Sequence, residues 1–243
     1  MATWIVHLRI AEHMLGVISG LQEDAFTLGN VAPDSGIPDE NWEHFDPPPK
    51  VTHFQPEDNS LFRCADLDFF RAYLSPNTSL LGKEDFSIRL GYFFHLVTDN
   101  LWYLRVGKPA WERWRAQFST DAKFWDEIKS DWYGLDHIYV RNHPESLFWR
   151  VFVKCAYQED SLPFLPPQAV QHQLTHIQNY YRSNKQNVLG MLKRPFHHLN
   201  MSQVDGFVDE ANRKLFDIYQ KLWIDKIATD DCMSSLQLID SIS

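Results

Sequence analysis

The sequence predicts an all-α protein that folds as a single compact domain of several helices. Apolar residues recur every three or four positions through most of the 243 residues, which places them on one face of a helix. Strand signals are scarce: KVTHF at residues 50–54 is a short extended candidate, and no Asn-Gly or Asp-Gly turn joins two alternating runs. No internal repeat divides the chain 1–243, so we expect one helical domain.

Four segments of the first half have helical periodicity. The first covers residues 3–19, and its apolar face is formed by Ile5, Leu8, Ala11, Leu15 and Ile18. A second helix is expected over residues 61–74. A third, over residues 84–106, is apolar nearly all round and should therefore be buried. Residues 108–132 carry aromatic side chains at helical intervals, with a break near Ser119.

Later helices are expected at residues 144–157, 167–183 and 202–227. Residues 228–243 contain Ser and Asp and are expected to form a flexible tail. Residues 29–60 differ from both, because they combine little periodicity with much Pro, Asp, Asn and Glu. A loop of this length inside a compact domain is usually functional or disordered, and we expect this one to carry ligands of a site.

The composition excludes several classes of protein. A net charge of −9 and a pI near 5.6 argue against a general nucleic-acid binder, which normally has a basic surface. The three cysteines, Cys64, Cys155 and Cys232, are too scattered for a disulfide framework or a CxxC metal clip. The first residues lack the basic start of a signal peptide, and no run approaches ~18 apolar residues. We therefore expect a cytoplasmic protein without a transmembrane segment.

Candidate metal ligands lie in the first hundred residues. They are His7, Asp34, His53, His95 and Asp99. Imidazole and carboxylate are the usual nitrogen and oxygen ligands of zinc. His95 and Asp99 are four residues apart in an apolar helical run, so both side chains point to one side of the helix. A buried polar pair needs a partner, and a divalent metal ion is a sufficient one.

Each of these residues, taken alone, also has a structural interpretation. His95 and Asp99 could hydrogen-bond to each other in the core, and His7 could be a satisfied core histidine. Asp34 follows Pro33 and could cap a helix or form an Asx-turn, and His53 could lie on a surface loop. Their joint occurrence in a specific order favours the metal site over these alternatives.

That order resembles the zinc-dependent phospholipase C family and the related single-strand-specific zinc nucleases. The matching segments are V-H-L, V-A-P-D, T-H-F and L-G-Y-F-F-H-L-V-T-D, within residues 4–105. The resemblance implies a compact all-helical fold of the zinc-dependent phospholipase C type with a zinc cluster. On this basis Asp34, His53, His95 and Asp99 would bind one metal ion. Asp99 would also bridge towards a second metal ion bound by His7.

The chain departs from the family pattern at two points. In the secreted phospholipases the amino group of the mature N-terminus also binds zinc after a leader is removed, whereas here Met1 shortly precedes His7 and no leader is visible. The family's later H…H-x-x-x-E ligands are also missing, and the nearest substitute, DWYGLDH, offers Asp131, Asp136 and His137. The resemblance therefore implies an intracellular member with one or two metal ions.

The function that we expect is zinc-dependent hydrolysis of phosphate esters, with phosphodiesters favoured. Asp34 is the candidate catalytic base, and other divalent metals could replace zinc. The expected partner is a phosphate-ester small molecule or a lipid headgroup. The first alternative is a non-catalytic helical binding or scaffold protein with a structural or vestigial metal site.

A second alternative, a single-strand nuclease, would need stacking aromatic side chains such as Trp102, Tyr103 and Trp132, for which core packing is the simpler interpretation. His172 and His176 form an HxxxH pair without the glutamate of a metalloprotease. Because glutamines surround them, we expect this pair on a solvated helix face.

Overall fold

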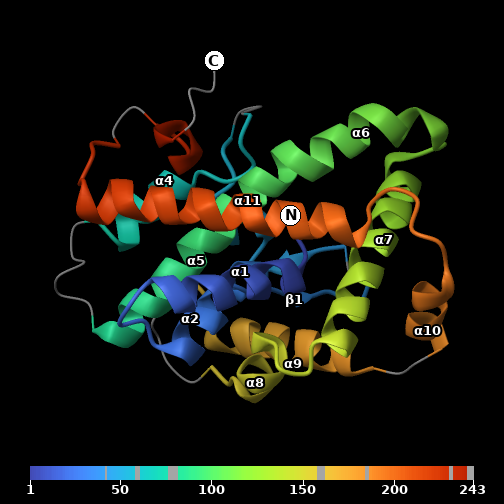
Figure 1. Ribbon diagram of the computed structural model, residues 1–243, viewed down its shortest axis with the longest axis horizontal. Helices are drawn as coiled ribbons and strands as arrows, with labels where there is room; N and C mark the ends of the chain where they lie inside the picture. Colours follow the sequence, from blue (N-terminus) through green and yellow to red (C-terminus); the bar gives the residue numbers. More distant parts are fainter. Residues whose placement is uncertain are drawn as a thin grey trace.

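The computed structural model describes residues 1–41, 43–57, 61–75, 82–157, 162–183, 186–229 and 232–239. It confirms an all-α fold, with 68% helix and 2% strand. The long helices are α1 (Trp4–Val17), α5 (Lys83–Trp102), α7 (Asp121–Asn142), α9 (Pro167–Arg182) and α11 (Met201–Tyr219). In the view of Figure 1, α1 lies between α11 and α9, and α1 contacts α5, α7 and α11.

Shorter elements connect these helices. The short α-helices are α2 (Glu23–Gly29), α3 (Pro49–Thr52), α4 (Asp66–Tyr73), α6 (Lys108–Trp114), α8 (Leu147–Arg150) and α10 (Gln186–Lys193). The 3-10 turns are η1 (Ala32–Asp34), η4 (Arg115–Gln117), η5 (Phe152–Lys154) and η7 (Ser235–Leu238), and the π-turns are η3 (Tyr103–Gly107) and η6 (Gln220–Ile224). Strands β1 (Ile37–Pro38) and β2 (Phe45–Asp46) pair antiparallel.

Two glycines let α2 and α5 pack backbone against backbone. A Cβ atom on Gly91 of α5 would lie 2.5 Å from the carbonyl oxygen of Phe26, and one on Gly29 of α2 would collide with the carbonyl of Ile88. Only residues without a side chain allow this approach. The contact brings Asn30, which follows α2, next to His95, one turn beyond Gly91.

The periodicity predicted the long helices well, but their ends and the short elements less well. The helices α1, α9 and α11 begin within about two residues of the predicted starts at residues 3, 167 and 202. η6 extends α11 to Ile224, close to the predicted end at residue 227. The break near Ser119 is confirmed, because Thr120 caps the start of α7 by accepting a hydrogen bond from the Lys123 amide. The sequence did not predict α2, α10 or the β1–β2 pair.

Two expectations about individual segments are wrong, and a third is right only from Asp66 onward. The extended segment 50–54 instead begins within the short helix α3, because Pro49 occupies a first-turn position where its missing amide hydrogen costs nothing. The helix over residues 144–157 is reduced to α8 and η5, and the Gln178 side chain donates to the carbonyls of Phe152 and Cys155. The helix over residues 61–74 begins only at Asp66, since the amides of Arg63 and Cys64 donate to Asn100.

The expected flexible tail, residues 228–243, is wrong for residues 235–238. These residues form η7, in which Ser235 and Leu236 are buried. Asp66 accepts hydrogen bonds from the Ser234 hydroxyl and the Ser235 amide, which fixes this segment to α4. Residues 230, 231 and 240–243 lie outside the described residues.

The buried apolar side chains form one continuous core that extends from α1 to η7. In the described part of the chain, no helix has both the length and the apolar character that crossing a lipid bilayer would need. After Gly29, which ends α2, residues 30–60 contain only η1, the two short strands and α3 where they are described, so this segment remains the least regular part of the first half.

Candidate metal centre

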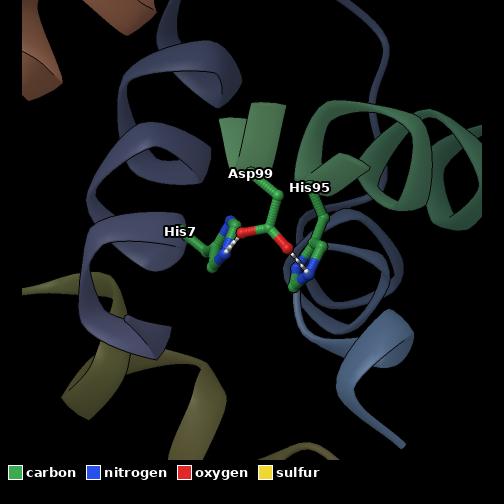
Figure 2. A group of neighbouring side chains, drawn as sticks. All are labelled: His7, His95 and Asp99. Atoms are coloured by element: carbon green, nitrogen blue, oxygen red, sulfur yellow. Dashed lines mark ion pairs between the residues drawn. The ribbon is translucent and has the colours of Figure 1, made fainter. Parts of the chain in front are cut away.

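The structure brings the five predicted ligands together from four separate segments. His7 comes from α1, Asp34 ends η1, His53 directly follows α3, and His95 and Asp99 lie one turn apart on α5. Figure 2 shows the Asp99 carboxylate next to the rings of His7 and His95, which stack on each other with their centroids 3.8 Å apart. Its Oδ1 lies 3.4 Å from His7 Nε2, and its Oδ2 lies 3.5 Å from His95 Nε2.

His53 and Asp34 complete the cluster on its other side. His53 Nε2 lies 3.3 Å from Asp34 Oδ1 and 3.6 Å from Asp99 Oδ2. Two compact triads result, His7–His95–Asp99 and Asp34–His53–His95, in each of which the ligand atoms lie within 4.8 Å of one another. Each triad could hold one metal ion. His95 belongs to both triads, whereas the sequence analysis gave the shared position to Asp99 alone.

Hydrogen bonds behind the rings direct two histidines into the cluster. His95 Nδ1 lies 2.8 Å from the carbonyl oxygen of Asn30, and His53 Nδ1 lies 2.9 Å from the Thr52 hydroxyl. A carbonyl only accepts, so His95 Nδ1 carries the hydrogen and the lone pair of the neutral ring is on Nε2. Such bonds to the outer nitrogen are typical of metal-ligating histidines.

The inner atoms of the cluster have no hydrogen-bond partners. Both nitrogens of His7, the Nε2 atoms of His53 and His95, and Asp99 Oδ2 are buried and unsatisfied. Such atoms are rare in folded proteins because each loses its hydration without compensation. The Nε2 atoms of His53 and His95 face the same carboxylate oxygen, and a cation bound between these three atoms would satisfy all of them. The donor set of imidazoles and carboxylates fits zinc.

The protonation states of the cluster differ from ligand to ligand. Burial disfavours the charged form of His95, but the carboxylates of Asp99 and Asp34 outweigh burial and raise the pKa of this ring, so a metal ion would have to displace its proton. Burial, assisted by the nearby His95, lowers the pKa of His7 to about 4, so this ring is neutral at pH 7. Burial opposes ionisation of Asp99, but the positive charges of the Met1 amine and His95 hold its pKa well below the ordinary value. Burial opposes ionisation of Asp34 as well, but the contact with His53 and the charges of His95 and His53 together lower its pKa. Deprotonated ligands are those that bind a metal ion.

A cavity of about 220 Å³ reaches the cluster at Asp34 and His53. The side chains of His7, His95 and Asp99 are fully buried, whereas that of Asp34 is 9% exposed. Aromatic side chains form much of the cavity wall: Trp4, Phe45, Trp132 and Tyr133. The cluster therefore has one described opening, through which a small molecule could approach Asp34.

The weak candidates for further ligands, Asp131, Asp136 and His137, do not belong to the described cluster. Asp131 accepts hydrogen bonds from Arg194 and from the backbone amides of His197 and His198. Asp136 accepts from the hydroxyls of Thr3 and Tyr181, and His137 Nδ1 lies 3.1 Å from Arg141. These side chains of α7 therefore fix neighbouring segments.

Of the other polar and aromatic candidates, His176 and Trp132 line the cavity, whereas His172 and Trp102 do not. His172 is exposed as expected, but His176 is half-buried, lines the cavity and packs against Trp4. Trp102 is buried in the core, while Trp132 packs against it and also lines the cavity. The sequence did not predict the cavity as a whole. Only Trp4 could have indicated it, because this aromatic residue lies three residues before His7 on the same helix.

No protein-family model, curated protein or solved structure matches the chain significantly. The fold and the site thus define the class of the protein: it is all-α and has a buried His/Asp cluster that could hold a metal ion.

Proposed function

We propose that the protein is a zinc-dependent hydrolase of phosphate esters, with phosphodiesters as its main substrates, similar to the zinc-dependent phospholipases C. The observation that carries the proposal is the unsatisfied Oδ2 of Asp99, which faces His53 and His95 beside an accessible Asp34. The order of these residues along the chain, which resembles that family, supports the same conclusion.

The two triads have distinct positions in this proposal. His7, His95 and Asp99 hold an inner metal ion, and Asp34, His53 and His95 hold an ion at the cavity, if two are bound. When bound, zinc would act as a Lewis acid that lowers the pKa of water to about 7 and so makes it a usable nucleophile at neutral pH. The buried hydrogen bonds of the His95 ring with the Asn30 carbonyl and of the His53 ring with the Thr52 hydroxyl keep the rings in position, so little reorganisation is needed when substrate binds.

Asp34 acts as the general base. Its carboxylate is ionised, because the contact with His53 and the charges of His95 and His53 together lower its pKa despite burial, and it is the carboxylate that lines the described cavity. A carboxylate at that position can accept the proton of the attacking water while the phosphate ester occupies the cavity. Asp99 has no access to the cavity and serves as a ligand only.

The test is the substitution Asp34→Asn, which keeps the size of the side chain but removes the base. We expect turnover of chromogenic phosphodiesters to fall by roughly 100-fold or more, as for loss of a general base. Because Asp34 also belongs to the triad with His53 and His95, turnover is compared at zinc concentrations that saturate both proteins. Asp46→Asn, an exposed aspartate of the same loop, is the matched control and should keep full activity.

Three measurements separate the outcomes: metal content, turnover of a panel of phosphomonoesters and diesters, and thermal stability with and without a chelator. Full turnover by Asp34→Asn would show that the base is wrong. A wild-type protein that binds zinc tightly and loses stability on chelation, yet hydrolyses no ester, would be a helical scaffold with a structural metal.

A further inference from the structure

The cavity beside Asp34 and His53 has an apolar, aromatic wall. Trp4 of α1, Phe45 of β2, and Trp132 and Tyr133 of α7 line it together with three prolines. Flat apolar groups gain both burial and ring-stacking energy in such a place. A cavity of about 220 Å³ is also small, so it fits a compact organic group and not a polymer.

The charges at the cavity decide which organic groups fit. Of the described residues that line it, Asp34 is the one carboxylate, and it lies 3.3 Å from His53. Two residues with a positive charge line the same cavity: Lys129 of α7, which is exposed and forms no ion pair with a described residue, and Met1 with its amine. An aromatic wall can bind a quaternary ammonium group, but an unpaired ammonium beside it opposes a second positive charge.

A buried hydroxyl completes the site. Ser35, next to Asp34, lines the cavity, is 2% exposed, and its Oγ has no hydrogen-bond partner. A hydroxyl that lost its hydration without gaining a partner could donate to an oxygen of a bound phosphoryl group once its side chain rotates towards the cavity. The cavity thus offers a polar end at Asp34 and Ser35 and an apolar end between the aromatic side chains.

We propose that this cavity receives the organic group of the phosphate ester, that the group is apolar and carries no positive charge, and that Lys129 discriminates against cationic headgroups such as choline. The inference rests on the proposed function for the identity of the phosphoryl group. It adds the substrate class, which the metal cluster alone does not define.

The test compares two phosphonates that are not hydrolysed and differ mainly in their organic group: phenylphosphonate and 2-(trimethylammonio)ethylphosphonate. Calorimetric titration of the zinc-loaded full chain gives both dissociation constants. We expect phenylphosphonate to bind at least about tenfold more tightly, a difference of roughly 1.4 kcal/mol. The ratio of the two constants cancels the attraction of Lys129 for the shared phosphonate.

Lys129→Glu should reduce this ratio, because it replaces a charge that repels the trimethylammonium group by one that attracts it. We expect a change of about tenfold and not more, because an exposed charge is partly screened by solvent and salt. Lys123→Glu is the matched control, since Lys123 is also an exposed lysine of α7 but does not line the cavity. An unchanged ratio in Lys129→Glu, equal binding of both phosphonates by the wild type, or binding of neither would overturn the inference. Selective binding without hydrolysis of any ester would leave the inference standing and contradict the proposed function.

Discussion

Asp99 is the residue on which the candidate metal centre depends most. Its Oδ1 accepts a hydrogen bond from the Ala2 amide at 2.7 Å and lies near His7, while its Oδ2 faces His53 and His95. One carboxylate thus contacts three imidazoles, and water does not reach it, because its side chain is 0% exposed. Without a cation, the unsatisfied atoms around it would destabilise the fold.

His53→Ala tests the cluster at the level of a single ligand. Removing this imidazole takes one donor from the triad with Asp34 and His95, so we expect zinc affinity to fall by roughly 100-fold. Loss of a ligand should weaken binding at least as much as loss of a residue that only orients a ligand. Competition with a chromogenic chelator measures the change. His172→Ala, an exposed histidine of α9, should retain the wild-type affinity; equal affinity of both variants would remove His53 from the site.

At the level of elements, the packing of α2 against α5 positions the site. The carbonyl of Asn30 reaches His95 Nδ1 because Gly29 and Gly91 let the two backbones touch. The same packing places η1, and with it Asp34, beside α5. The geometry of the metal ligands therefore depends on two glycines that bind nothing.

Gly91→Ala should destabilise the protein by about 2–3 kcal/mol, because its Cβ would lie 2.5 Å from a backbone oxygen that cannot move freely. Gly206→Ala on α11 is the control: nothing lies within 4 Å of the added Cβ, and the substitution should stabilise the helix by about 0.5–1 kcal/mol. Urea unfolding gives both values. A Gly91→Ala protein as stable as the wild type would contradict the close packing described here.

The sequence predicts those features that depend on local spacing. Helix α9 was expected at residues 167–183 and spans Pro167–Arg182, since its apolar period is local. His95 and Asp99 were predictable for the same reason. In contrast, η5 ends at Lys154, and the next carbonyl, that of Cys155, accepts a hydrogen bond from Gln178, which is 23 residues further along the chain. The cavity joins α1, α7, α9 and the loop, and no local pattern of Lys129, Ser35 or His176 indicates it.

At the level of the whole molecule, the candidate metal centre connects α1, α5 and the irregular segment 29–60 around one core. The C-terminal η7 docks on Asp66, which also accepts a hydrogen bond from Asn100, the residue after Asp99. A metal ion held by ligands from these separate segments binds only the folded chain, so its binding energy stabilises the entire fold.

The central claim is that the five side chains form a metal centre, and metal-dependent thermal stability tests it most directly. Protein stripped with a chelator and then titrated with zinc should take up one or two ions per chain. At free zinc about 100 times the dissociation constant, stabilisation is about 2.7 kcal/mol, which corresponds to a rise in Tm of roughly 5–10 °C. A stripped protein that takes up no zinc, or any other divalent metal, and whose Tm stays the same would contradict the account.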